Sequence, residues 1–348
     1  MHKNIFLFIT ILCCSLLPAH AKAATPINEI KFAVLAPEGS TWLNLMREFN
    51  TQITKESKDQ IQFRIFPGGI SGDEFDVIRK MKFGKIDSAG FTGVGLGQIL
   101  PAIRVLELPR LFSSYQEIDY VTAKIRPYFE KEFDKKGYVL LGWAEVGFVN
   151  MFSNKPLDSL KALEGIKMWT WEGDPLAKEL FEKLKIVPNP MPVTDVYTSL
   201  QTGLINSVYV SPLAAIALQW FTKTKYMTTL KLTNATGAIL MTKKSFEKLS
   251  PVQKKLLTER TNIFCKRLVE ASRTDNDKAY GTLKKNNVKP IELNPEDVVK
   301  FDQISESVWG SLTGKLYSKE LLDQVLKYRS EFRAGKAETK AKTTKGKK

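Results

Sequence analysis

The spacing of hydrophobic residues in the first third of the chain alternates between the periods of a strand and of a helix. Alternation of apolar and polar residues predicts strands over about 30–34 and 61–65 and another from Ile86. Apolar residues at helical spacing predict helices over 42–53 and about 73–83. This β-α-β-α-β order predicts an α/β architecture with parallel pairing of the first strands.

Further helices are marked by capping residues at their starts. Each of these residues is followed by proline or by a glutamate or glutamine three positions on, and the pairs are Ser114 with Glu117, Asp174 with Pro175, Ser250 with Gln253, and Asn294 with Pro295. The helix that begins at Pro251 is expected to run to about Asn286. A helix of that length can brace two lobes.

Two long stretches of the chain carry no charge. The first has 16 residues between Asp87 and Arg104, and the second has 27 residues between Asp195 and Lys223. Polar residues and Pro212 recur within the second stretch, which excludes a lipid-facing helix. We interpret these stretches as buried core together with the lining of an apolar cavity.

The N-terminus has the pattern of a secretory signal peptide over 1–23. Lys3 precedes an apolar run from Ile5 to Leu17, and small residues at Ala19, Ala21 and Ala23 provide two overlapping cleavage sites. The run is too short to span a bilayer, which takes about 20 residues. We therefore expect a secreted chain, and the absence of a disulfide framework favours the bacterial periplasm.

The residue composition of the chain restricts the catalytic and metal chemistry that it can perform. The chain has 348 residues, of which 43% are hydrophobic, enough for two domains with large cores. Cleavage removes His2 and His20, the only histidines, and leaves Cys265 as the only cysteine. The mature chain then has no Ser-His-Asp or Cys-His nucleophile, no histidine metal site and no internal disulfide. We expect no cofactor, no metal and no enzymatic activity.

The net charge of +15 is concentrated toward the C-terminus, where Arg333 to Lys348 contains seven basic residues and one acidic residue. Residues 334–348 contain no aromatic residue, and we expect a disordered basic tail. It is either a solvated terminus or an attachment to anionic membrane or cell wall. Nucleic acid is not an expected partner, because no stacking aromatics interleave with the lysines.

Two motifs invite catalytic interpretations. The run GFTGVGLG at Gly90 to Gly97 has neither the GxGxxG spacing nor the Lys-Ser/Thr pair of a phosphate loop. Glu172 and Asp174 form a candidate carboxylate pair for glycoside chemistry, but Asp174 is better explained as the N-cap of the helix opened by Pro175. An enzyme is therefore the least favoured class.

At Pro190 to Asn206 the sequence reads PMPVTDVYTSLQTGLIN, and this segment resembles the substrate-binding proteins of tripartite ATP-independent periplasmic (TRAP) transporters, of the dicarboxylate-binding type. Other matching segments occur in the same order, namely FPGG at Phe66 to Gly69, GKID at Gly84 to Asp87, LPRLF at Leu108 to Phe112, NKPL at Asn154 to Leu157 and LEGIKMW at Leu163 to Trp169. The resemblance covers about Ile27 to Phe332.

The resemblance implies a two-lobed α/β periplasmic solute-binding protein, type II-like, with mixed sheets flanked by helices and a long bracing helix. We expect lobe I over 24–148 with about 235–274, and lobe II over 149–234 with about 275–333. Such a protein closes on its ligand by a hinge motion and delivers it to membrane permease subunits.

Four positions depart from the family pattern. The resemblance implies an Arg that forks onto a ligand carboxylate at the end of the GIK segment, and here that residue is Trp169. A second basic residue, the Arg of a family Gly-Phe-Arg segment, is replaced here by Val149 in Gly147-Phe148-Val149. Where the family has Asp-Gly, this chain has Asn206-Ser207. The Glu-Asn that the family has just beyond it falls near Tyr209-Val210 of this chain. A subset of the family lacks the Arg and works with a periplasmic tetratricopeptide-repeat partner.

An unpaired buried carboxylate costs several kcal/mol, so these departures predict an uncharged or hydrophobic, lipid-like ligand. Trp169 and Trp171 lie two apart on a predicted strand and therefore face one side. The predicted ligand-binding residues are Trp169, Trp171, Val149, Phe148, Tyr197, Asn206, Tyr209, Val210, Phe91, Thr92 and Trp42.

Two alternatives remain open. In the first, Trp169 and Trp171 are core residues, and a relocated cation such as Arg104 or Arg110 serves a small organic acid. In the second, the chain is a ligand-sensing or scaffold protein that serves no permease.

Overall fold

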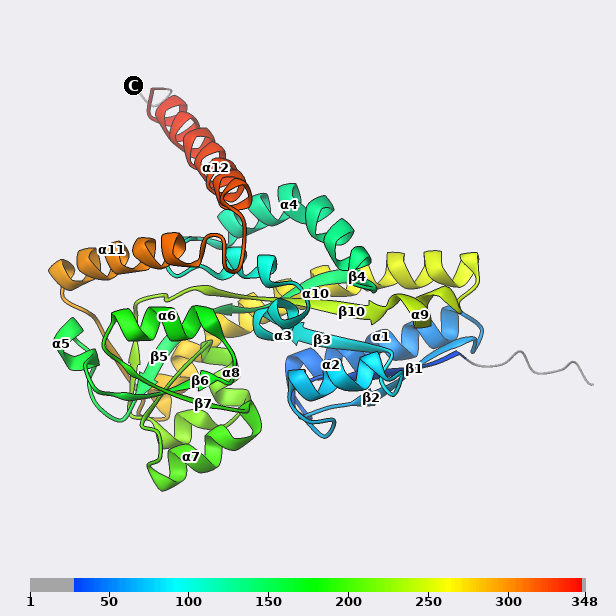
Figure 1. Ribbon diagram of the computed structural model, residues 1–348, viewed down its shortest axis with the longest axis horizontal. Coiled ribbons are helices and arrows are strands. Elements are labelled where there is room, and N and C mark those ends of the chain that lie inside the picture. The colour runs from blue at the N-terminus through cyan, green and yellow to red at the C-terminus, as the bar shows by residue number, and fades with distance from the viewer. Residues whose placement is uncertain (1–27, 346–348) are drawn as a thin grey trace, which may run out of the picture.

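The computed structural model describes residues 28–345 of the chain, with side chains as far as Lys336. The predicted signal peptide lies outside the described residues. Two sheets, each flanked by helices, form two lobes, and the α/β class predicted from the sequence is confirmed (Figure 1).

The first sheet has the strand order β2-β1-β3-β10-β4. Its strands are β1 (Asn28–Ala33), β2 (Ile61–Phe66), β3 (Ser88–Thr92), β4 (Tyr138–Phe148) and β10 (Asn234–Thr242). β1 pairs in parallel with β2 and β3, as predicted, and β10 is antiparallel to both of its neighbours. The helices that follow the first three strands are α1 (Thr41–Glu56), α2 (Glu74–Lys82) and α3 (Gly93–Ile99). The 3-10 helix η1 (Pro101–Glu107) and the helix α4 (Tyr115–Lys135) come next.

The second sheet has the strand order β11-β9-β5-β8-β6-β7. Its strands are β5 (Asn150–Ser153), β6 (Lys167–Trp171), β7 (Val187–Met191), β8 (Ser207–Val210), β9 (Tyr226–Thr228) and β11 (Lys289–Ile291). The helical segments of this part of the chain are α5 (Leu160–Leu163), α6 (Pro175–Lys183), η2 (Val193–Asp195), α7 (Val196–Thr202), α8 (Pro212–Ala217) and η3 (Trp220–Lys223).

The predicted bracing helix is α10 (Pro251–Lys285), and its predicted bounds are confirmed to within one residue. Ser250 and Gln253 form a reciprocal capping box at its start. α10 follows the short helix α9 (Lys243–Glu247) and contacts α1 and β4 of the first lobe and α8 and β11 of the second. Up to the end of α10, the chain therefore crosses between the lobes at β4–β5, at β9–β10 and along α10.

The other predicted helix starts are also confirmed. Ser114, Asp174 and Asn294 cap α4, α6 and α11 (Pro295–Leu312) through their side chains. One detail differs, because the Glu117 carboxylate accepts from the backbone N–H of Ser113 at 2.7 Å instead of that of Ser114.

The C-terminal segment departs from two expectations. Helix α12 (Lys319–Lys345) packs on α4 and η1, so this part of 275–333 lies on the first lobe, not on the second. α12 then continues through most of 334–348, where the sequence analysis expects disorder, and projects from the body (Figure 1). Alanine and lysine, which are frequent in this segment, have high helix propensities, in agreement with a helix here. Within 28–345, no helix is long and apolar enough to cross a membrane.

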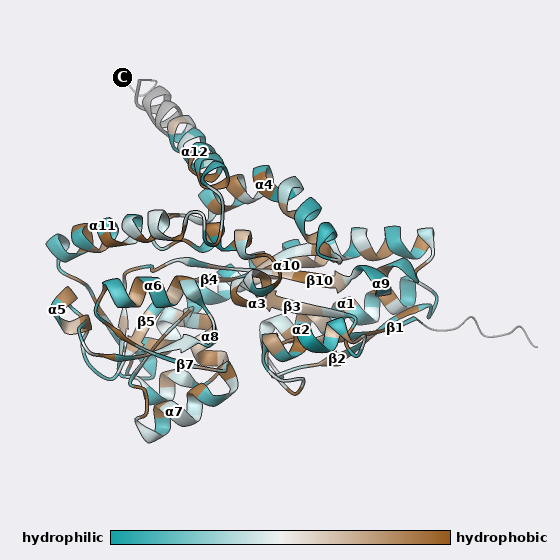
Figure 2. Cartoon of the chain, viewed as in Figure 1, coloured by the Kyte–Doolittle hydropathy of each residue, from teal (hydrophilic) through white to brown (hydrophobic). Residues whose placement is uncertain are grey.

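The hydrophobic core is continuous across the two lobes. One cluster of buried residues extends from β3 and α3 through η1 and α4 to β6, α6 and α11. In Figure 2 the hydrophobic colour gathers on β3 and α3, while the outer helices show hydrophilic faces. A smaller aromatic cluster of the second lobe includes Trp169 and Trp220. This second cluster forms part of the site described next.

Candidate functional site

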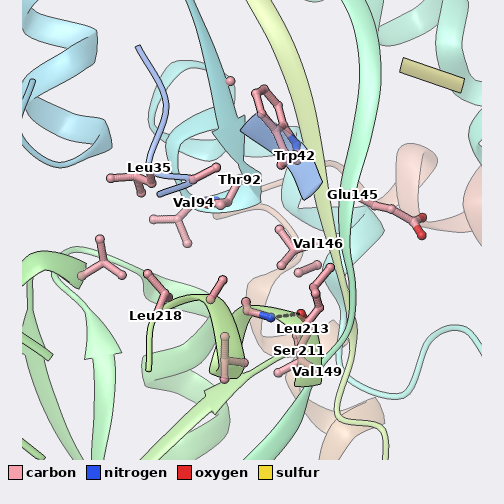
Figure 3. Close-up of a pocket in the computed structure, with 18 of the residues that line it drawn as sticks. Leu35, Trp42, Thr92, Val94, Glu145, Val146, Val149, Ser211, Leu213 and Leu218 are labelled. Atoms are coloured by element: carbon pink, nitrogen blue, oxygen red, sulfur yellow. Dashed lines mark hydrogen bonds between the residues drawn. The ribbon is translucent and has the colours of Figure 1, made fainter. Parts of the chain in front are cut away.

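A cavity of about 520 Å³ lies between the two lobes. This volume is within the range of about 300–1,000 Å³ that small-molecule sites occupy. The first lobe lines it with the segment 34–42 and with Phe91 to Val94, and the second lobe with α8 and the ends of β6 and β8. Figure 3 shows Leu35, Thr92 and Val94 on one side and Leu213 and Leu218 on the other. Val146 and Val149, from the crossing strands, complete the wall.

The second lobe contributes an aromatic wall centred on Trp169, which is 2% exposed. Its ring lies 5.3 Å from that of Trp171, stacks on Tyr209 at 5.3 Å and meets Trp220 edge-on at 5.1 Å. Its indole N–H donates to the Met191 carbonyl at 3.1 Å. Trp169 and Trp171 both line the cavity, so the prediction that they share one face of β6 is confirmed.

Glycines of the GFTGVGLG run allow close packing around the cavity. A Cβ on Gly90 would lie 2.8 Å from the Trp42 ring, and a Cβ on Gly95 would lie 2.5 Å from the Glu74 carboxyl group. A Cβ on Gly93 would overlap the Glu107 carboxyl group. The glycines therefore make room for the side chains that form the first-lobe wall. This packing role explains why the run is rich in glycine although it lacks the spacing of a phosphate loop.

A cluster of buried charged groups lies in the cavity wall. Arg104 of η1 donates from Nη2 to both oxygens of Asp174, at 3.1 and 3.0 Å. Its Nη1 lies 3.1 Å from Oε2 of Glu107 without the angle of a hydrogen bond. Each of the three residues is 5% exposed. Asp174 also accepts from the backbone N–H of Leu176, so its prediction as an N-cap is confirmed.

The charge of Arg104 is compensated within this cluster. Burial acts to lower the pKa of Arg104, but Asp174 and Glu107 outweigh it and raise the pKa above its ordinary value. Burial raises the pKa of Glu107, and the positive charge of Arg104 opposes that rise. Arg104 is the only lysine or arginine among the described residues that line the cavity. It therefore stays charged but faces two carboxyl groups of the protein.

The other acidic residues of the lining are also accounted for. Glu145 is paired with Arg273, with Nε 2.6 Å from Oε1, and Figure 3 shows its carboxylate pointing away from the cavity. Glu38 pairs with Arg47. Glu74 is buried, and its oxygens accept from the backbone N–H groups of Thr92 at 2.6 Å and Gly95 at 2.7 Å.

Burial raises the pKa of Glu74 to about 8, with the hydrogen bonds from Thr92 and Gly95 acting against the rise. Since its pKa in an unfolded chain is near 4.5, folding takes up a proton between these values, and stability is lost as the pH rises from about 5 to 8. Glu74→Gln removes this pH-dependent loss of stability. It also places the amide NH2 of glutamine, which cannot accept a hydrogen bond, near the Gly95 N–H, and this lowers the free energy of unfolding by about 1–3 kcal/mol. We expect the wild type to be the more stable at pH 5, and the variant to close or reverse the gap by pH 8.

Urea unfolding of the wild type and Glu74→Gln at pH 5 and pH 8 measures this difference. Burial also raises the pKa values of Glu107 and Glu145. Both residues are present in both proteins, so their contributions to the pH dependence of stability cancel in the comparison. An unchanged stability gap at the two pH values would show that Glu74 does not titrate in this range.

The two lobes touch at the rim of the cavity. Asp73, the N-cap of α2, accepts at Oδ2 from the indole N–H of Trp171 at 2.8 Å and from the backbone N–H of Val193 at 3.2 Å. Together with the pair of Arg104 and Asp174, these contacts join the end of β6, the segment after β7 and the start of α6 to the first lobe. This structure therefore represents a form in which the lobes lie against each other.

Most of the predicted ligand-binding residues line the cavity, namely Trp42, Phe91, Thr92, Val149, Trp169, Trp171, Tyr209 and Val210. Three do not. Phe148 alternates with Val149 along the chain, and its ring packs on Tyr115 at 4.8 Å, away from the cavity. Tyr197 lies on α7, and Nζ of Lys223, at the end of η3, is 5.3 Å from the centre of the Tyr197 ring. Asn206 precedes β8 and accepts from the Lys167 N–H at 3.0 Å.

The position of Asn206 has a simple cause. The cavity meets β6 and β8 at Trp169, Trp171 and Tyr209, toward their carboxyl ends, while Asn206 lies at the amino end of β8. In open α/β sheets ligands bind beyond the carboxyl ends of the strands.

Several lining residues were not predicted as site residues. Leu213, Ile216 and Leu218 come from α8 and the residue after it, inside the uncharged stretch that indicated a cavity. The length of that stretch was the usable signal. The sequence contains no comparable signal for Glu74 and Glu107, because nothing in the neighbouring residues distinguishes a buried carboxyl group from an exposed one. Within residues 28–345 no cluster of histidine, cysteine, aspartate and glutamate could hold a metal.

Two α/β lobes that the chain joins by several crossings, with a cavity between them, define a two-lobed ligand-binding protein. The sequence profile of the bacterial extracellular solute-binding proteins, family 7, matches residues 32–315. The chain belongs to this family, and its resemblance to the TRAP binding proteins is confirmed. The family and the similar solved structures are solute-binding proteins, not enzymes, as expected.

Solved structures show the fold in detail. The sugar acid binding protein of Advenella mimigardefordensis, in complex with galactonate, matches with a TM-score of 0.83 at 23% identity, covering 87% of this chain and 98% of that one. A TRAP periplasmic protein of Xanthobacter autotrophicus with bound β-D-galacturonate has a TM-score of 0.81 at 18% identity, over 86% and 99%. These likenesses establish the fold alone.

Among curated relatives, a solute-binding protein of Roseobacter denitrificans is 28% identical over 206 residues, which is 59% of this chain and 62% of the relative. The chain thus matches less than two thirds of that relative's length. The family and its structures are extracellular or periplasmic proteins, which implies a periplasmic location.

Proposed function

We propose that this protein is the substrate-binding component of a TRAP-type transporter, and that its ligand is uncharged and largely apolar, such as a lipid-like metabolite. The observation that carries the proposal is the state of Arg104. This residue is the single cation of the described lining, and the protein's own Asp174 and Glu107 already occupy it. A ligand carboxylate would enter a wall whose positive charge is compensated.

The rest of the wall supports an apolar ligand. Trp169, Trp171 and Tyr209 line the cavity together with Leu35, Val94 and Leu218. Each Å² of apolar ligand surface removed from water contributes about 25 cal/mol. An ionised carboxylate buried without a cation costs several kcal/mol, which offsets much of that gain.

A second candidate, a binder of sugar acids, is favoured by the similar structures, which hold galactonate and galacturonate. It would require a free cation at the cavity. Arg104 is engaged as described, and Arg110 is not in the lining and pairs with Asp302, with Nε 2.6 Å from Oδ1. The proposal for an uncharged ligand therefore accounts better for the residues of this chain.

Two measurements test the proposed function. Mass spectrometry of an organic extract from gently purified protein is expected to yield a neutral hydrophobic compound at about one per chain. The Tm of delipidated protein is expected to rise with decan-1-ol and to stay unchanged with galacturonate, glucuronate or succinate. A rise in Tm with any of these acids, together with no response to the alcohol, would refute an uncharged ligand.

We propose that the partners are the membrane permease subunits of the transporter, reached after closure around the ligand. The resemblance to the subset without the Arg adds a periplasmic tetratricopeptide-repeat protein as a proposed partner. Co-purification of permease subunits with the tagged protein tests this assignment against a sensing or scaffolding role. Deletion of the basic segment 334–348 tests whether it contributes to membrane or cell-wall attachment.

A further inference from the structure

We infer that Asp174 is the residue that sets the charge specificity of the cavity, because its carboxylate occupies the place on Arg104 that a ligand carboxylate would take. The inference rests on the proposed function, since it explains why a cavity that contains an arginine favours uncharged ligands. Glu107 has an auxiliary part, as the second acidic group facing Arg104.

Arg104 holds the Asp174 carboxylate through one nitrogen of its guanidinium, in a charge-assisted contact. Both oxygens of Asp174 lie within 3.1 Å of Nη2 of Arg104, and both side chains are nearly inaccessible to solvent. Charge-assisted bonds of this kind are about twice as strong as neutral ones. A ligand acid that takes this place on Nη2 must displace Asp174, and it would leave that carboxylate buried without its cation.

The two partners come from different lobes. Arg104 lies on η1, which packs on β10 of the first sheet, while Asp174 caps α6 beside the second sheet. In acid-binding members of the family, as the resemblance implies, the ligand carboxylate pairs with an arginine. Here the second lobe supplies the carboxylate itself, so the lobes can meet across a neutral ion pair without an acidic ligand.

The cluster retains spare hydrogen-bond donors. Within the described residues, Nε and Nη1 of Arg104 and the hydroxyl of Tyr209 have no hydrogen-bond partner. All of these groups belong to residues of the cavity lining. If Asp174 lost its carboxylate, a ligand carboxylate would find a guanidinium with one remaining acidic neighbour, Glu107, and unused donors beside it.

Asp174→Ser is the sharpest substitution for this purpose. Serine is among the preferred N-cap residues, so α6 keeps its cap, while the carboxylate is removed and space is vacated beside Arg104. A matched pair of probes, decan-1-ol and decanoate, differs mainly in the charge of the head group. The ratio of their Kd values therefore reports charge specificity separately from apolar affinity.

Titration calorimetry at pH 8 is expected to show that the wild type binds decan-1-ol and discriminates against decanoate. In Asp174→Ser, decanoate affinity is expected to rise by about tenfold to a hundredfold, since a hydrogen bond to a charged group contributes about 1.5–3 kcal/mol. The alcohol affinity of the same variant is the reference for this gain, so the ratio of the two Kd values is expected to shift toward decanoate. Adding Arg104→Met to Asp174→Ser is expected to abolish the gain.

The outcomes separate the inference from the proposed function. If the wild type binds decanoate as tightly as decan-1-ol, the proposed function is wrong. If the wild type discriminates but folded Asp174→Ser discriminates equally, or if the gain persists without Arg104, Asp174 does not set the specificity. Should Asp174→Ser fail to fold, Asp174→Asn, which keeps both an N-cap side chain and the volume of aspartate while removing its charge, takes its place. It must raise decanoate affinity severalfold for the inference to stand.

Discussion

Replacing Arg104 with methionine is expected to lower the free energy of unfolding by about 3–5 kcal/mol, because removing one member of a buried ion pair leaves the others without a counter-charge. Asp174 and Glu107 would both remain in the wall, each 5% exposed. Burial raises the pKa of Glu107, so protonation of Glu107 at lower pH relieves part of the cost, and the loss is expected to be smaller at pH 5 than at pH 8. Urea unfolding followed by circular dichroism measures it.

The matched control is Arg110→Met, six residues along the chain. Arg110 pairs with Asp302, whose side chain is 45% exposed, and ion pairs near the surface contribute about 0–1 kcal/mol. We expect a loss of less than about 1 kcal/mol for this variant. Equal losses for the two substitutions would contradict the compensated cluster at Arg104.

Much of the fold was predictable because local patterns and the global structure agree. The alternation over β1 and β2 and the capping box at Ser250 required no knowledge of distant contacts. The exceptions arise where distant contacts decide. The docking of α12 on α4 depends on surfaces far apart in the sequence, and nothing within the segment 319–333 indicates which lobe it covers.

The site was predictable only on its apolar side. Trp169 and Trp171 could be placed on one face because strand periodicity is local, and both line the cavity. Arg104 and Asp174 are 70 positions apart, and their pairing follows from how the two lobes meet. Asn206 was predicted as a site residue from the family pattern and Tyr197 as an aromatic residue of the cleft, yet the amino end of β8 and α7 lie away from the cavity.

Trp169→Ala is expected to lower the free energy of unfolding by about 3–5 kcal/mol, because truncating a buried tryptophan removes its transfer free energy and leaves a void. Three aromatic rings lose their common partner, and the Met191 carbonyl loses its donor. Trp169→Phe keeps most of the packing and is expected to cost about 1–2 kcal/mol, mainly for the lost hydrogen bond. Urea unfolding compares the two. Decan-1-ol binding is expected to weaken markedly in the alanine variant and little in the phenylalanine variant, since the ligand shares the wall that stabilises the second lobe. Unchanged alcohol affinity in Trp169→Ala would place the ligand away from this wall.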